Sequence, residues 1–166
     1  MKLFKNKYIK LELSSNVFHP TGTSDLLIEA IKDNLRLNGS VLDVGAGSGY
    51  VGIALLKIFK RVSCMAGEDG TELVKKVINE ANNHLLKEGV LIFPVLSFSN
   101  TSKIIKYANN KFKYVKKISS KQWLLPKKMY KDLPILKKLK KKKIINYKVN
   151  FGMLLWKTDI YFAFNS

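Results

Sequence analysis

The middle of the chain alternates between short apolar runs and segments whose apolar residues recur at helical spacing. The apolar runs at 39–45 and 90–98 follow turn residues and predict buried strands. Residues 48–59 are apolar on nearly every face, which predicts a helix packed on a sheet. Residues 70–89 predict an amphipathic helix, and Gly89 is a natural residue to follow its end. Strands that alternate with helices in this way are typical of an α/β fold with a parallel sheet.

The N-terminal part of the chain predicts a strand and a capped helix. Residues 7–13 alternate between polar and apolar side chains, which is typical of an edge strand or of one arm of a hairpin. Residues 17–31 predict a loop followed by a helix, because the apolar residues of its second half share one helical face. The side chains that we expect to cap this helix are Thr23, Ser24 or Asp25.

The C-terminal part predicts one more helix and two strands. Residues 100–112 predict a short helix that Asn100 or Thr101 caps. Residues 113–123 and 150–164 predict strands, and the second of these patterns is the stronger.

Composition limits the class of protein. The 166 residues suit a single domain with its own core, since 46% of them are apolar. The single cysteine, Cys64, excludes an internal disulfide and indicates a reducing compartment. No apolar run has the length of a membrane-spanning helix, and the N-terminal residues lack the apolar core of a signal peptide. These features predict a cytoplasmic protein without a membrane partner, and they leave its oligomeric state open.

The net charge of +18 adds a possible class of partner. Such a charge attracts phosphate backbones, and the lysines at 137, 138 and 140–143 are its densest group. Arginine, the better partner for phosphate and guanine, occurs only at Arg36 and Arg61. Two interpretations stay open. The lysines form a face that binds nucleic acid or an acidic partner, or they reflect an AT-rich genome and a solvated helix end.

The clearest chemical motif is the loop DVGAGSG, which begins at Asp43 and contains Gly45, Gly47 and Gly49 between a predicted strand and a predicted helix. Glycines let the backbone turn tightly and approach a cofactor closely. The spacing is not the G-x-G-x-x-G of dinucleotide sites, and no P-loop lysine follows. An acid at the strand end repels phosphate but suits a cofactor with an ammonium group, such as S-adenosylmethionine. The alternative is a tight turn whose glycines serve packing alone.

Three segments resemble a known family. VLDVGAGSGYVGIALL resembles motif I of the class I S-adenosylmethionine-dependent methyltransferases. VFHPTGTSDLLIEAI resembles the V-F/Y-x-P-x-x-D-T-x-L-L segment of the HemK-like protein-glutamine methyltransferases and of related ribosomal RNA guanine methyltransferases. MAGEDGTELVKKVINEANNHLLKEGVLIFPVLSF resembles the segment that follows the catalytic strand in that group.

The resemblance implies a Rossmann-like fold, in which a mostly parallel sheet carries helices on both faces and has an antiparallel C-terminal strand. It implies an enzyme that transfers a methyl group from S-adenosylmethionine to a nitrogen of a protein glutamine or an RNA base. The substrate would be a release-factor-like protein or ribosomal RNA. The cofactor residues that it implies are Asp43 and the three glycines of the loop, with Thr23 and Ser24 at the family's Asp-Thr pair. The acid of that pair is lost here, and the hydroxyl is kept at Ser24.

The catalytic N-P-P-Y motif of that group is absent, since none of the four prolines is doubled. The catalytic residues therefore remain unknown. About two strand-helix units are missing between the ends of the second and fourth strands of that fold, and because such a unit takes roughly 30 residues, roughly 50 residues are absent. This absence supports an alternative function, in which the chain is a catalytically inactive, truncated methyltransferase-like domain that binds nucleic acid or protein through its basic surface. A further alternative is a chain that needs a second chain to complete its sheet.

The sequence predicts a single methyltransferase-like domain over residues 1–166. Within it we expect a cofactor-side segment at 1–35, a first strand-helix-strand unit with motif I at 39–65, and the C-terminal half of the sheet at 66–166. The stretch AGEDGTELV, residues 66–74, begins the last of these parts.

Glu68 is a candidate for binding the cofactor's ribose. It lies 19 residues after Gly49, close to the offset of about 20 residues expected for such an acid. The alternative is an exposed acid at a helix start, where the helix dipole favours it. His19 lies beside the cofactor-side segment and is a candidate for a substrate contact, whereas His84 fits a helix surface. No spacing of histidine, cysteine and acidic residues predicts a metal site.

Overall fold

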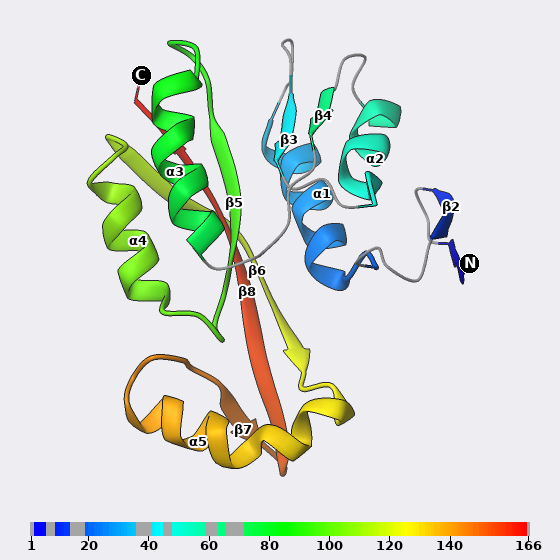
Figure 1. Ribbon diagram of the computed structural model, residues 1–166, viewed down its shortest axis with the longest axis vertical. Helices are drawn as coiled ribbons and strands as arrows, with labels where there is room; N and C mark the ends of the chain where they lie inside the picture. The colour runs from blue at the N-terminus through cyan, green and yellow to red at the C-terminus, as the bar shows by residue number, and fades with distance from the viewer. Residues whose placement is uncertain are drawn as a thin grey trace. The chain divides into compact units, whose positions relative to one another are not determined.

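The computed structural model describes residues 2–5, 9–13, 19–35, 41–44, 48–58, 63–65 and 72–165 (Figure 1). The chain divides into two compact units, Met1–Gly70 and Thr71–Ser166. We call Met1–Gly70 unit 1 and Thr71–Ser166 unit 2, and each unit has its own strands and helices. Within the described residues, no helix is both long and apolar enough to cross a bilayer.

Unit 1 begins with a hairpin and a helix. β1 (Lys2–Lys5) pairs with β2 (Lys10–Leu13) in antiparallel orientation, which confirms the predicted hairpin arm. The helix α1 (Gly22–Asn34) follows, and its buried side chains include Ile28 and Ile31. Apolar residues at helical spacing therefore form the buried face that the sequence predicts.

The cap of α1 differs from the prediction. Thr21 is the N-cap residue, and its side chain and that of Ser24 form a reciprocal capping box. Thr23, Ser24 and Asp25, the expected caps, lie inside the first helical turn. The helix begins earlier because a cap at Thr21 has a hydroxyl-bearing partner three residues later, which satisfies two backbone donors at once.

The rest of unit 1 is a strand-helix-strand unit. β3 (Leu42–Val44) and β4 (Ser63–Met65) pair in parallel orientation, and α2 (Tyr50–Ile58) connects them. Parallel neighbours need such a crossover, so the apolar segment after the glycine loop forms the expected helix. The predicted burial of β3 was wrong: Leu42 and Val44 are 57% and 50% exposed. Among the described strands β3 pairs with β4 alone, and so small a sheet leaves its strand faces open.

The helices of unit 2 are α3 (Glu72–His84), α4 (Thr101–Asn109) and α5 (Leu133–Lys141), with the 3₁₀ helix η1 (Lys127–Asp132) before the last. The amide of Asn100 accepts a hydrogen bond from the Lys103 N–H at 3.1 Å, which confirms the predicted cap of α4.

The strands of unit 2 form one antiparallel sheet. Its central strand is β8 (Met153–Phe164), which lies between β5 (Leu91–Leu96) and β6 (Tyr114–Leu124) and is antiparallel to both. The short β7 (Lys148–Asn150) also pairs with β8, through a tight hairpin. The antiparallel C-terminal strand of the prediction is therefore confirmed.

The α/β class is confirmed, but the sheet of unit 2 is not parallel as predicted. β5 and β6 run in the same direction, with α4 between them in sequence, yet β8 separates them. The parallel pairing among the described strands is β3 with β4. Periodicity predicts each strand but not its neighbour, and a later segment occupies the place beside β5.

Unit 2 has two apolar clusters, one for each end of its sheet. The first packs α3 and α4 on the sheet, and its buried members are Ile78, Phe93, Val95, Ile104, Ala108, Phe112 and Ala163. The second packs α5 against the other end of the long strands, and its buried members are Leu125, Leu136, Ile145 and Tyr147.

The end of α3 differs from the prediction. The helix ends at His84, five residues before Gly89. Gly89 instead closes a turn in which its N–H donates to the Leu86 carbonyl at 2.7 Å. A Cβ atom at Gly89 would lie 2.9 Å from the same carbonyl oxygen, so the close approach of the backbone, rather than a helix cap, requires glycine here.

Candidate cofactor site

The candidate site lies in unit 1, where β3 is followed by α2. Asp43 is the central residue of β3, and its Oδ2 accepts a hydrogen bond from the Gly52 N–H at 3.1 Å. Gly52 is the third residue of α2, so its N–H belongs to the first turn, which has no partner within the helix. The carboxylate therefore serves as a remote cap of α2, and this bond fixes its position.

Asp43 also has an unusual electrostatic setting. Partial burial raises the pKa of its carboxyl above the ordinary value, and the hydrogen bond from Gly52 partly offsets that rise. The charged form of Asp43 is thus incompletely solvated and would be stabilised by a nearby cation. This observation fits a cofactor that carries an ammonium group or a sulfonium.

Gly49 shapes the turn that leads into α2. Its φ of +71° lies in the left-handed region, where glycine carries no steric penalty. Its carbonyl accepts the Ile53 N–H at 2.8 Å, and the Ser48 Oγ accepts the Tyr50 N–H at 3.4 Å. Gly49 therefore sets the direction from the loop into the helix. Gly45 and Gly47 lie outside the described residues.

The two hydroxyl residues of α1 have different positions. The Ser24 Oγ accepts the Thr21 N–H at 3.4 Å, so the hydroxyl that the resemblance assigns to the cofactor also caps the helix. Thr23 lies in the same first turn and is half-buried. The structure thus places Thr23 and Ser24 on one helix start, whereas Asp43 lies on β3.

Sequence reasoning missed a contact between α1 and α2. The hydroxyl of Tyr50 donates to the Asp25 carboxylate, and the Tyr50 residue is 1% exposed. This bond joins the first turn of α1 to the first turn of α2. The two residues are 25 positions apart, and no periodicity links them; a tyrosine directly after the glycine loop was the one available signal.

Other residues that the sequence singles out lie in different places, and one of them, Cys64 of β4, pairs with Asp43 of β3. Glu68 lies outside the described residues. His84 ends α3 in unit 2, where its exposed imidazole lies 3.7 Å from the Glu80 carboxylate. Cys64 is the middle residue of β4. Among the residues that the structure describes, no group of three histidine, cysteine or acidic side chains is placed to hold a metal ion.

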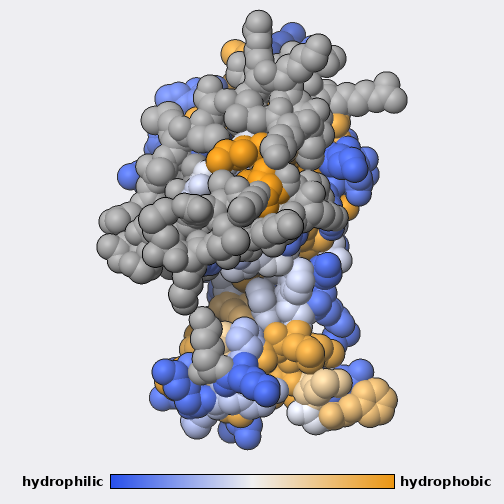
Figure 2. Space-filling model, turned by 90° about the vertical axis from the view of Figure 1, so that its right-hand side faces the viewer, coloured by the Kyte–Doolittle hydropathy of each residue, from blue (hydrophilic) through white to orange (hydrophobic). Residues whose placement is uncertain are grey.

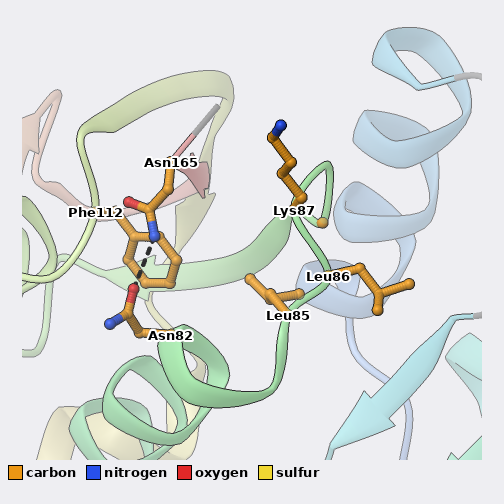
Figure 3. A pocket seen from close by; sticks show the side chains of 7 residues that line it. Asn82, Leu85, Leu86, Lys87, Phe112 and Asn165 are labelled. Atoms are coloured by element: carbon orange, nitrogen blue, oxygen red, sulfur yellow. Dashed lines mark hydrogen bonds between the residues drawn. The ribbon is translucent and has the colours of Figure 1, made fainter.

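Unit 2 contains a small hollow beside the end of α3, with a volume of about 210 Å³ (Figure 3). The Asn165 amide donates to the Asn82 amide oxygen at 2.8 Å, and the Asn165 Oδ1 accepts the Lys113 N–H at 2.9 Å. Figure 3 shows Leu85 and Leu86 on the opposite side of the hollow from this amide pair. The amides are engaged in holding chain segments together, so the hollow has the character of a packing gap.

Comparison with known proteins adds to this geometry. No protein-family model matches the chain. The chain is 28% identical over 96 residues to release factor glutamine methyltransferase from Dictyoglomus turgidum. The matched part covers 53% of this chain and 34% of that relative, so the chain spans about a third of the relative's length.

The structure is similar to the crystal structure of precorrin-6y C5,15-methyltransferase from Geobacter metallireducens. The TM-score is 0.51, the sequence identity is 12%, and the match covers 93% of each chain. At that identity the similarity concerns the fold alone.

Proposed function

We propose that unit 1 binds S-adenosylmethionine, as the resemblance of this chain to the class I S-adenosylmethionine-dependent methyltransferases implies and as its similarity to release factor glutamine methyltransferase supports. The observation that carries the proposal is Asp43. Its carboxylate lies on β3, the first strand of a parallel strand-helix-strand unit, accepts the Gly52 N–H and is only partly solvated. A carboxylate in that setting favours a cationic ligand.

Each remaining residue of the proposed site has a specific task. Gly49 holds the turn, and Gly45 and Gly47 belong to the same loop and would let the cofactor approach the backbone. Thr23 and Ser24 would offer hydroxyls to the methionyl end of the cofactor. Glu68 would bind the ribose hydroxyls.

We propose as the reaction the transfer of a methyl group to a nitrogen of a protein glutamine or an RNA base. S-adenosylmethionine would supply the methyl group: its sulfur–methyl bond would break as the nitrogen–carbon bond forms, the electron pair would stay on the sulfur as a neutral thioether, and the nitrogen's proton would pass to solvent. The chain's own contribution is to bind the cofactor and the acceptor and to orient the acceptor nitrogen toward the methyl group. Such positioning can account for much of the rate enhancement of a methyl transfer. The relative's name favours a release-factor-like protein as substrate.

Isothermal titration calorimetry of the full chain with S-adenosylmethionine tests the site. We expect heat of binding for the unaltered chain and at least about tenfold weaker binding for Asp43→Asn, since an interaction with a charged group contributes about 1.5–3 kcal/mol. Asp33→Asn is the matched control, because Asp33 is an exposed acid at the other end of α1. Absence of heat at millimolar cofactor would overturn the proposal.

Activity needs a second measurement. Tritiated methyl transfer to purified release factors and to ribosomes would identify the acceptor. Cofactor binding without a labelled product on either would contradict the proposed reaction and leave the inactive, truncated domain as the better description.

A further inference from the structure

Charge is distributed very unevenly between the two units. Unit 2 holds 21 of the 30 basic residues and 5 of the 12 acidic ones, which gives it a net charge of +16. Unit 1 holds the other 9 basic and 7 acidic residues, which gives it +2. An asymmetry of this size indicates a partner of opposite charge for one part of the chain.

The excess is concentrated in one part of unit 2. Residues 125–156 comprise η1, α5, β7 and the adjoining end of β8, and they form the basic lobe. This lobe contains ten lysines, no arginine and a single acid, Asp132. Nine of the ten lysines are exposed in the described structure: Lys127, Lys131, Lys137, Lys138, Lys140, Lys141, Lys142, Lys143 and Lys148.

The basic lobe is a folded element with an oriented face. Leu136 of α5 is buried against Ile145 and Tyr147, so the lysines on the other side of the helix point outward. The Lys140 Nζ donates to the Tyr147 carbonyl at 2.7 Å and lies 4.3 Å from the centre of that ring. The lysines are thus held on a scaffold instead of extending from a solvated tail.

The hairpin between β7 and β8 carries an aromatic side chain in a costly position. Phe151 has a φ of +47°, Gly152 has a φ of +74°, and Phe151 is 91% exposed. Two positive φ values fit a type I′ turn, in which asparagine or glycine is normal at the first position. An exposed phenylalanine there loses backbone stability and buries nothing, and such an outlier points to a functional constraint.

Apolar and cationic side chains lie side by side around this hairpin. Leu124, Val149 and Met153 are exposed large hydrophobic residues on β6, β7 and β8. Figure 2 shows hydrophobic and hydrophilic side chains intermixed at the lower end of the view, where Figure 1 has η1, α5 and β7. Lysines that contact phosphates beside an aromatic ring that stacks on a base are the features of single-strand binding surfaces.

We infer that the basic lobe binds single-stranded RNA, with Phe151 stacking on a base and the lysines of α5 contacting phosphates. Unstacked bases in the cell are found mainly in RNA loops and single strands. Because the lobe lacks arginine, it has no rigid, planar fork of donors for reading a base edge, and we expect the binding to depend little on sequence. This inference goes beyond the proposed methyl transfer and does not depend on the cofactor site.

Fluorescence anisotropy of the full chain with a labelled oligouridine, measured without cofactor, tests the inference. We expect the affinity to fall at least about tenfold between 50 and 200 mM salt, because lysines release counterions from the phosphates. Changing Lys137, Lys138 and Lys141 to Glu should abolish most of the binding. The matched control changes Lys76, Lys87 and Lys103, which are exposed in unit 2 outside the lobe, to Glu.

Phe151→Asn isolates the stacking contribution. Asparagine tolerates positive φ, so the variant should unfold at the same or a higher temperature while binding oligouridine about tenfold more weakly, with an unchanged salt slope. Phe151→Tyr keeps a ring and should retain the affinity.

Three results would overturn the inference. The first is an equal loss of binding in the two lysine triple variants, which would assign the effect to net charge. The second is equal or tighter binding of duplex DNA. The third is displacement of the oligouridine by vesicles containing phosphatidylserine, which would make the lobe a membrane-binding surface.

Discussion

Unit 1 and unit 2 differ in composition in a way that separates two explanations of the charge. Lysine makes up 7 of the 70 residues of unit 1 and 21 of the 96 residues of unit 2. A bias of the genome toward lysine codons would act on both units alike. We therefore interpret the difference as support for a partner of opposite charge for unit 2, which codon usage alone does not predict.

The two units also differ in the secondary structure on which their functional candidates lie. Unit 1 places an acid and a glycine turn on a parallel strand-helix-strand unit, and unit 2 places lysines on an antiparallel sheet. Both tryptophans, Trp123 and Trp156, belong to unit 2. Tryptophan fluorescence consequently reports on unit 2, and substitutions in either unit can test whether the two unfold separately.

The largest effect is expected from the buried isoleucines. Ile78 is fully buried in the first cluster of unit 2, and Ile78→Ala should lower the free energy of unfolding by about 2–5 kcal/mol. The fluorescence transition in urea should shift accordingly. Ile28 is equally buried in α1 of unit 1, and Ile28→Ala should leave that transition in place. A shift in both variants would show that the units unfold together.

A smaller effect is expected from the bond that joins α1 to α2. Tyr50→Phe removes the hydroxyl that donates to Asp25, and a hydrogen bond to a charged group contributes about 1.5–3 kcal/mol. Amide hydrogen exchange should become faster in peptides from 19–35 and 48–58. Exchange in peptides from 72–165 serves as the internal control, and faster exchange there would contradict the separation of the units.

Gly49 and Gly152, the glycines with positive φ in the part of the chain that the structure describes, form a matched pair with a smaller effect still. Gly49→Ala and Gly152→Ala each introduce a Cβ at positive φ, at a cost of about 1–2 kcal/mol. The Cβ at position 152 would have no neighbour within 4 Å, and that at 49 would meet Ile53 at an ordinary contact distance of 3.5 Å. The first variant should affect exchange in unit 1, and the second should shift the fluorescence transition. The opposite assignment would argue against the division at residue 70.

The smallest effect is a dependence on pH in unit 1. The pKa of Asp43 is higher in the folded state than in the unfolded state, so Asp43 contributes to the stability of the fold at pH values below the ordinary aspartate pKa. This stabilising contribution is lost as the pH rises through the raised pKa. Asp43→Asn should remove that dependence from the exchange rates of unit 1. Affinity for S-adenosylmethionine should change in the opposite direction, falling as acid protonates Asp43. An affinity that rises as pH falls would contradict the role of Asp43.

The sequence predicts the local elements well and their neighbours poorly. The strand that contains Asp43 and the helix after the glycine loop follow from an apolar run and a turn motif, which are local signals, although the predicted burial of that strand was wrong. The insertion of β8 between β5 and β6 and the bond between Tyr50 and Asp25 depend on residues far apart in sequence. The cap at Thr21 was missed because several hydroxyl residues in a row satisfy the same local rule.

The central place of β8 also determines when unit 2 can form during synthesis. β5 and β6 each pair with β8, which follows every other described strand in the chain, so their inner edges stay unpaired until the ribosome has translated it. Unit 1 needs no such distant segment for its parallel pair. In a nascent chain, unit 1 with Asp43 and the glycine turn would thus fold first. At that stage unit 2 would still expose unpaired strand edges, which can bind chaperones or pair with the wrong strands.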